Sequence, residues 1–144
     1  VLIGAKGSAF ASTDHQGKTL NLQVVHNTLV NGAHAFSGGS WNGREGMLLA
    51  NNIIYSRDGN AFHFANGSAG VEIHGNVVLG HGDKHGSALG RGLEDLAAVS
   101  WDGRSHDARP VAGAPLEKAD PPHLLPHDLT GRPRLQPVCG AVAP

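Results

Sequence analysis

The histidine of the segment "AFHFA", His63, is the side chain whose neighbours most suggest a role in chemistry. It alternates with Phe62 and Phe64, and alternate residues of a β-strand face opposite sides of a sheet. If the two phenylalanines point into a core, His63 points outward, where its imidazole could hydrogen-bond to a ligand or act as a general base. An exposed histidine without function fits the same pattern. His34, in "AHAF", is harder to place, because the two Phe-containing segments align in more than one register.

A Gly-rich connector, "SGGSWNGREG", carries three further candidates, Trp41, Arg44 and Glu45. Aromatic faces stack on sugar rings, and arginine pairs with carboxylates. This connector is therefore a candidate rim of a carbohydrate-binding groove, with Trp41 and Arg44 as the contact residues. Alternatively, Trp41 folds back and covers an edge of the core.

Residues 80–87, "GHGDKHGS", concentrate two histidines, an aspartate and a lysine. Imidazole and carboxylate groups at this spacing could bind a metal ion, and Lys84 could neutralise an acidic ligand. No standard zinc spacing is met, so we predict no metal site, and a solvated turn is the simpler interpretation. Lys84 and His85 are kept as candidate ligand contacts. Nearer the C-terminus, His123 and His127 are separated by "LLP" and receive no role.

Three nine-residue blocks align without a gap and supply the elements that would position these side chains. Their first, third and eighth residues are apolar, the second varies, and the sixth is asparagine in every block. The blocks start 25 and 24 residues apart, with Gly-rich connectors between them. Each period then contains two short strands that meet at the asparagine, a turn and a third strand. The blocks are "LQVVHNTLV" (22–30), "MLLANNIIY" (47–55) and "VEIHGNVVL" (71–79).

Such periods favour an all-β fold in which each period stacks on the next. One period cannot bury its apolar face alone, and stacked strands lie about 4.8 Å apart, so equivalent residues would lie on one another. Asn27, Asn52 and Asn76 would then form a ladder of hydrogen-bonded amides. The ladder satisfies groups that cost about 1–3 kcal/mol each when they are buried without a partner. Asn51, beside Asn52, would point outward.

The overall composition limits the possible functions. The chain has 144 residues, enough for one domain with a moderate core, and a net charge of −1. It lacks the basic field that drives nucleic-acid binding, and no stretch approaches the roughly 20 apolar residues of a membrane span. The single cysteine, Cys139, excludes an intrachain disulfide framework and a cysteine zinc cluster.

The prolines divide the chain into two parts. All eight lie at or after Pro110, and proline is excluded from central strands because it cannot donate to the hydrogen-bond ladder. We therefore predict stacked strands over 1–87 and a Pro-rich capping tail over 88–144, with one short helix over 93–99. Because the chain opens on Val1 without a polar lead-in, we expect it to be the C-terminal piece of a longer protein.

The repeated blocks resemble the right-handed parallel β-helix family, the architecture of pectate lyases and related polysaccharide-active proteins. The segments that carry this resemblance are "HNTLVNGAHAF" and "ANNIIYSRDGNAF". The tail segment "HDLTGRPRLQPVCGAVAP" is similar to the C-terminal cap of many bacterial secreted β-helix proteins, which contain Asp-x-x-Gly-x-Pro-Arg and a closing Gly-Ala. The matching residues here are Asp128, Gly131, Pro133, Arg134, Gly140 and Ala141.

The resemblance implies an all-β, right-handed parallel β-helix (a solenoid), of which this chain holds the last three to four coils and an extended cap. It implies a secreted or cell-surface bacterial protein that binds an acidic polysaccharide and, if active, cleaves it as a lyase or glycoside hydrolase. The candidate substrate contacts are His63, Trp41, Arg44, Lys84 and His85.

Several parts of this functional expectation stay open. No Asp pair or Asp/Arg set identifies a particular enzyme family, so the catalytic residues are unassigned and expected in coils upstream of Val1, which would stack on this chain as its partner. The residues indicate no cofactor, although the family resemblance implies calcium as one option. The alternative function is a non-catalytic structural or surface module that serves as a rigid spacer or adhesin.

Overall fold

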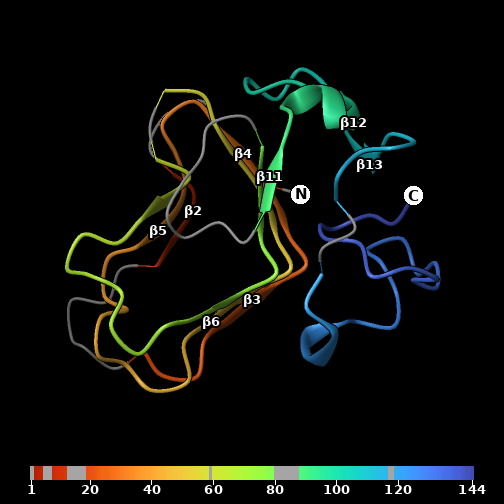
Figure 1. Ribbon diagram of the computed structural model, residues 1–144. Helices are drawn as coiled ribbons and strands as arrows, with labels where there is room; N and C mark the ends of the chain where they lie inside the picture. The colour runs from red at the N-terminus through yellow and green to blue at the C-terminus, as the bar shows by residue number, and fades with distance from the viewer. Residues whose placement is uncertain (1, 5–7, 13–18, 59, 80–87, 117–118) are drawn as a thin grey trace.

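The regular secondary structure of the described residues is almost entirely β-strand, arranged in three parallel sheets and one antiparallel pair (Figure 1). None of its helices is long and apolar enough to cross a membrane. The computed structural model describes residues 2–4, 8–12, 19–58, 60–79, 88–116 and 119–144. The strands are β1 (Leu2–Gly4), β2 (Ser8–Ser12), β3 (Gln23–Val25), β4 (Thr28–Asn31), β5 (His34–Gly38), β6 (Leu48–Ala50), β7 (Ile53–Ser56), β8 (Phe62–His63), β9 (Glu72–His74), β10 (Val77–Leu79), β11 (Ala88–Gly90), β12 (Leu96–Val99) and β13 (His106–Pro110), with 3-10 turns η1 (Leu93–Asp95) and η2 (Pro121–His123).

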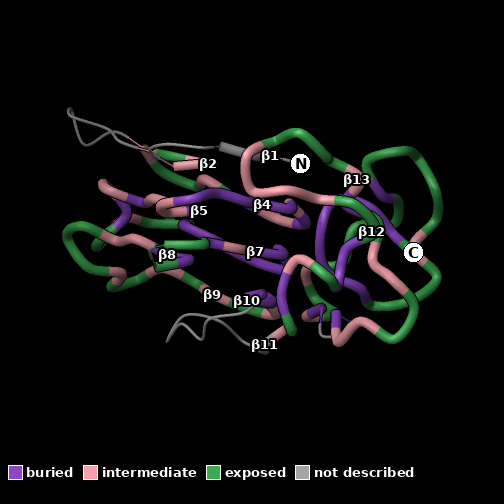
Figure 2. Tube along the Cα trace, turned by 90° about the horizontal axis from the view of Figure 1, so that it is seen from above, coloured by how far each residue is buried: buried purple, intermediate pink, exposed green. Residues whose placement is uncertain are grey.

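Consecutive strands of the chain enter different sheets. After β3 in one sheet, the chain passes to β4 in a second and β5 in a third, and β6, β7 and β8 follow the same order. β3, β4 and β5 each pair in parallel with the equivalent strand of the next repeat. The sheets are β3-β6-β9, β1-β4-β7-β10-β11 and β2-β5-β8. In Figure 1 the strands of one sheet lie behind one another, and Figure 2, turned by 90°, shows β4, β7 and β10 side by side.

The strand registers agree with the alignment of the nine-residue blocks. Leu29 lies opposite Ile54, and Ile54 lies opposite Val78. All three side chains are buried in the core between the three sheets, together with Phe36 and Met47. The stack also continues before the first block, because β1 pairs with β4 and β2 with β5.

The asparagines at the sixth position of the blocks are joined by hydrogen bonds. The backbone N–H of Asn27 donates to Oδ1 of Asn52 at 2.8 Å, and the N–H of Asn52 donates to Oδ1 of Asn76 at 3.0 Å. The Nδ2 group of Asn52 donates to the same Asn76 oxygen at 2.9 Å and to the carbonyl oxygen of Val24 at 2.8 Å. Asn52 and Asn76 have no exposed area, so the ladder satisfies amides that no water reaches.

Asn51 points away from the core between the sheets, as expected, but its side chain is not exposed. The residue before each ladder asparagine turns the corner between two strands with a left-handed backbone: His26 (φ 54°), Asn51 (φ 56°) and Gly75 (φ 60°). Asn51 is fully buried, because its side chain bonds to the tail that runs along these corners. Asparagine and glycine accept this conformation more readily than other residues.

The tail covers the outer face of the five-stranded sheet and creates a second core. Ile53, Val77 and Leu79 face this tail, where they pack against Leu116 and Val138. Both faces of the sheet are therefore buried, which explains why the second halves of the blocks are apolar apart from Thr28. In both overall views β12, β13 and the C-terminus lie to one side of the stacked strands.

The tail differs from its sequence prediction at its start. Ala88–Gly90, placed in the tail, forms β11 and pairs with β10, so the stacked region extends past residue 87. The short helix predicted over 93–99 is wrong: only Leu93–Asp95 forms a 3-10 turn, and Leu96–Val99 is a strand paired with β13. The carboxylate of the buried Asp95 receives the backbone N–H of Arg91 at 2.6 Å, which holds the chain in a turn instead of a longer helix.

Two side chains of the cap-like motif organise the rest of the tail. The Asp128 carboxylate accepts the backbone N–H groups of Thr130, Arg132 and Ala143 at 2.8, 2.9 and 3.0 Å. Burial opposes its ionisation, but these hydrogen bonds hold the pKa of Asp128 well below its usual range. Arg134 donates to the carbonyl oxygens of Val138, Gly140 and Ala141.

Candidate functional site

The outward face of the β3-β6-β9 sheet is the surface on which a site can be built. The registers place Gln23, Leu48 and Glu72 in one row across the three strands. Gln23 and Glu72 are exposed, whereas Leu48 is only 7% exposed although it points away from the core. The second outward row consists of Val25, Ala50 and His74.

The tail is brought against this face by Asn51. Its Oδ1 accepts the backbone N–H of Asp120 at 2.5 Å, and its Nδ2 lies within hydrogen-bond distance of the carbonyl oxygens of Asp120 (3.1 Å) and His123 (3.0 Å). These contacts lie at the two ends of η2. This turn begins at Pro121, and the fixed φ angle of proline suits the first position of a helical turn. A residue of the repeat corner therefore sets the position of His123.

A groove of about 390 Å³ lies between the sheet face and the tail. The polar residues that line it are Gln23 and Asn27 on the sheet side and His123 on the tail side. The groove thus combines hydrogen-bonding groups with an apolar floor and wall. The apolar and proline residues that line it are Val25, Leu48, Pro122, Leu124 and Leu125.

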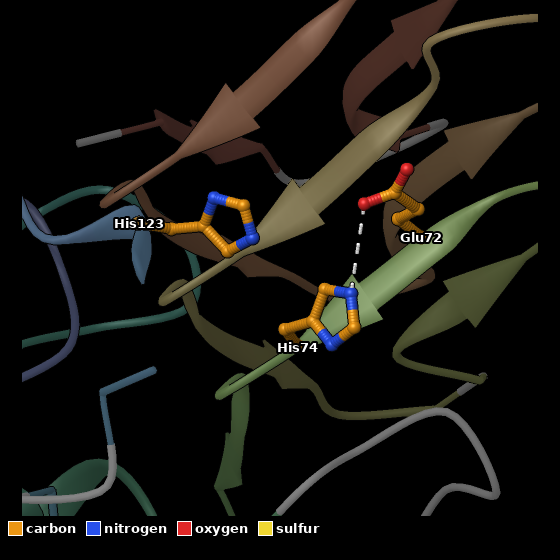
Figure 3. Close-up of side chains that lie close together, drawn as sticks. All are labelled: Glu72, His74 and His123. Atoms are coloured by element: carbon orange, nitrogen blue, oxygen red, sulfur yellow. Dashed lines mark ion pairs between the residues drawn. The ribbon is translucent and has the colours of Figure 1, made fainter. Parts of the chain in front are cut away.

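Glu72, His74 and His123 bring three metal-binding side chains together beside this groove (Figure 3). One donor atom from each residue lies within 4.8 Å of the other two, and Oε2 of Glu72 is 3.7 Å from Nε2 of His74. The imidazole rings of His74 and His123 have centroids 5.5 Å apart and are inclined by 23°. Figure 3 shows the carboxylate and the two rings directed toward a common space, with two side chains on β9 and the third on the tail.

Asp120 adds a second carboxylate to the edge of this cluster. Its Oδ2 lies 3.6 Å from Nε2 of His123, and its side chain is 30% exposed. The side-chain exposures of Glu72, His74 and His123 are 65%, 45% and 26%. Donor atoms that are accessible and backed by negative charge can bind a cation or hydrogen-bond to a ligand.

A fourth histidine, His26, lies buried behind this surface. Its Nε2 is 3.3 Å from Nδ2 of Asn51, so the ring accepts from the amide when it is neutral. Burial, together with the positive charge of Arg134, lowers the pKa of His26 from 6.5 to about 4. His26 is therefore uncharged at neutral pH and serves the packing of the tail.

His63 lies on another face of the molecule. In the β2-β5-β8 sheet Phe62 points into the core and His63 is half-buried, and the register sets Ser37 opposite His63. Its ring stacks on that of His34 with centroids 4.4 Å apart, and its Nδ1 is 3.4 Å from Oγ of Ser37. His34 and His63 therefore form a pair that is separate from the groove and the Glu72 cluster.

Trp41 cannot take the binding role considered for it. Its side chain has no exposed area, and its ring meets Phe36 edge-on at 5.0 Å between centroids. The alternative, in which the tryptophan folds back over the core, describes its position. An indole enclosed in this way presents no face to a sugar ring.

The remaining candidates do not join the groove. Arg44 is partly exposed in the connector between β5 and β6, where its backbone N–H donates to the carbonyl oxygen of Trp41 at 3.1 Å, and it does not line the groove. Lys84 and His85 lie outside the described residues.

Sequence reasoning missed Glu72, His74 and His123 as a group. Glu72 and His74 are two residues apart in an alternating strand, which is a usable signal that their side chains leave the same face. No comparable signal links them to His123, because the contact depends on how the tail returns to the sheet. Comparison of the chain with protein-family models, with curated proteins and with solved structures gave no match.

Proposed function

We propose that this chain is part of a secreted right-handed parallel β-helix protein, and that it binds a polysaccharide in the groove between the β3-β6-β9 face and the tail. The observation that carries the proposal is the groove itself, in which amide and imidazole groups lie beside apolar side chains. Sugars offer hydroxyl groups to the former and C–H faces to the latter.

The arrangement of the strands supports the β-helix part of the proposal. Three consecutive strands enter three parallel sheets, and equivalent residues of successive repeats stack, including the asparagine ladder. Stacked repeats present long outer faces on which an extended polymer can lie. The extended tail covers one outer face and leaves the groove along another.

The lining of the groove argues for binding through hydrogen bonds and apolar contact. Among the described residues, the eight that line the groove include no lysine, arginine or carboxylate. The proposal is therefore restricted to binding, and the acidic character expected of the polysaccharide becomes a question for experiment. A cleavage reaction would need groups from elsewhere in the protein.

Affinity electrophoresis tests this proposal with gels that contain pectate, alginate, chondroitin or the neutral polymer xylan. We expect at least one polysaccharide to retard the protein, and Gln23→Ala to reduce the retardation several-fold because it removes the exposed amide of the groove. The matched control is His63→Ala, on the outer part of the β2-β5-β8 sheet, which should migrate as the unmodified protein does.

Loss of retardation in His63→Ala, with no effect of Gln23→Ala, would show that the polysaccharide binds at the His34–His63 pair. It would contradict binding in the groove. Absence of retardation in all four gels would overturn polysaccharide binding for these substrates and favour the spacer module. The electrophoresis is performed with EDTA, so that its outcome does not depend on metal ions.

A further inference from the structure

We propose that Glu72, His74 and His123 bind one divalent transition-metal ion, with zinc the best match, and that the ion fastens the tail to strand β9. This site goes beyond polysaccharide binding and requires no glycan. Its foundation is the gathering of three donor atoms within 4.8 Å of one another, from segments that lie far apart in the chain.

The distances leave room for an ion. The 3.7 Å between Oε2 of Glu72 and Nε2 of His74 is longer than a hydrogen bond. Zinc holds nitrogen and oxygen ligands at about 2.0–2.2 Å, so two donors on one tetrahedral ion lie roughly 3.3 Å apart. Exposed side chains reach that separation by small rotations about their χ angles, while the backbone stays in place.

The backbone positions are held from both sides. Glu72 and His74 alternate in β9, whose register with β6 fixes their common face. His123 is held by the hydrogen bond from Asn51 to its carbonyl oxygen at 3.0 Å. Because the fold already holds the tail beside the strand, metal binding does not carry the entropic cost of bringing them together. The ion has to order only three side chains.

The kind of donor selects the kind of ion. Two imidazoles and one carboxylate suit zinc, copper, nickel or cobalt, whereas calcium and magnesium require sets of oxygen ligands. Asp120, whose Oδ2 is 3.6 Å from Nε2 of His123, supplies a second negative charge beside the ion. A water molecule completes the coordination, because the partly exposed side chains leave one side of the site open to solvent.

Isothermal titration with zinc chloride at pH 7.5 tests the site on the full chain. We expect one zinc ion per chain and a loss of affinity of at least tenfold in His74→Gln, His123→Gln and Glu72→Gln. Zinc should also raise the melting temperature of the unmodified protein by several degrees, and EDTA should reverse the rise. Calcium should do neither.

Two control variants separate this site from other histidines. His106→Gln removes an exposed imidazole of β13, outside the cluster, and should bind zinc as the unmodified protein does. The double variant His81→Gln/His85→Gln addresses the His-rich segment 80–87, and binding should again be retained. Circular dichroism checks that every variant is folded, which the similar size of glutamine favours.

A second readout tests whether the ion joins the tail to the strand. Zinc should slow hydrogen exchange of the amides near residues 120–125 in the unmodified protein, and this protection should vanish in His74→Gln, whose altered side chain is on β9. Zinc binding that survives in the three cluster variants, or disappears only in the 80–87 double variant, would overturn the proposal. Absence of any zinc binding would overturn it as well.

Discussion

The side chain of Asn51 pairs with the backbone of Asp120 in both directions. Its Oδ1 accepts the Asp120 N–H at 2.5 Å, and its Nδ2 donates to the Asp120 carbonyl oxygen at 3.1 Å. The side-chain amide at a repeat corner thus satisfies the backbone hydrogen-bonding groups of a residue 69 positions later in the chain. This contact is why the tail meets the β3-β6-β9 sheet at a defined point and why His123 lies beside His74.

Replacing Asn51 by alanine should loosen the tail before it unfolds the stacked strands. Asn51→Ala removes the hydrogen bonds to Asp120 and His123, and it places a less tolerant residue at φ 56°. We expect a loss of about 2–4 kcal/mol in the free energy of unfolding, measured by urea denaturation. Limited proteolysis should cut the variant first within residues 119–128.

Asn21 provides a matched control for this change. It has nearly the same backbone conformation (φ 55°) but is exposed. Asn21→Ala should cost about 1 kcal/mol, the conformational part alone, with unchanged proteolysis of the tail. Equal effects of the two variants would show that the Asn51 side chain contributes little through its hydrogen bonds.

Asn52→Ala should destabilise the stacked strands as a unit. The substitution leaves the partly buried Asn27 N–H and the buried Val24 carbonyl oxygen without their side-chain partner. A cost of about 3 kcal/mol or more is expected from the unsatisfied groups and the lost volume. Hydrogen exchange should accelerate throughout β4, β7 and β10, which distinguishes this variant from Asn51→Ala. Protection that is lost only at the tail would contradict the ladder's structural role.

The asparagines show how much of the fold could be predicted from sequence. Alignment of the blocks correctly predicted the register of the strands, because residues that stack on one another are under the same steric and polar demands in every repeat. The same alignment did not predict that the tail buries Asn51. The fifth position holds His26, Asn51 and Gly75, whose shared property is a left-handed backbone and not a side-chain type.

The candidate site was less predictable, for a related reason. A repeat specifies what lies above and below a residue, but not what the non-repeating tail places against it. Leu48 thus points outward yet is covered, and His123, taken to be without a role, lies beside His74. Trp41 was considered as a ligand contact because Gly-rich connectors are typical of exposed loops. In the structure the Trp41 indole packs into the core instead.

Gly75→Ala should displace the tail by direct collision. A methyl group on this residue would lie 2.5 Å from the backbone nitrogen of Asp120 and would also overlap the Asn51 side chain, while φ is 60°. We expect a loss of about 3 kcal/mol or more, measured by thermal and urea unfolding. The control is Gly113→Ala, at φ 74° with no atom within 4 Å of the added carbon, which should lose only about 1 kcal/mol. Similar losses would mean that backbone conformation alone requires the glycine.

His26 should make the stability of the protein fall as the pH drops from 6.5 toward 4. Its pKa is about 4 in the folded chain because burial and the charge of Arg134 disfavour the imidazolium, whereas the unfolded chain titrates near 6.5. Below pH 6.5 the unfolded chain therefore binds a proton at His26 that the folded chain does not bind. The free energy of unfolding falls by up to about 3 kcal/mol by pH 4. Above pH 6.5 this group contributes no pH dependence. Urea unfolding at steps of half a pH unit measures how stability depends on pH. EDTA is present so that no metal ion competes for the other histidines.

His26→Asn, which retains a residue suited to φ 54°, should flatten the plot of stability against pH between pH 4 and 6.5 relative to the unmodified protein. An unchanged slope would assign the pH dependence to other groups, whereas a slope lost in His26→Asn but kept in His106→Gln would place it on the buried imidazole beneath the tail.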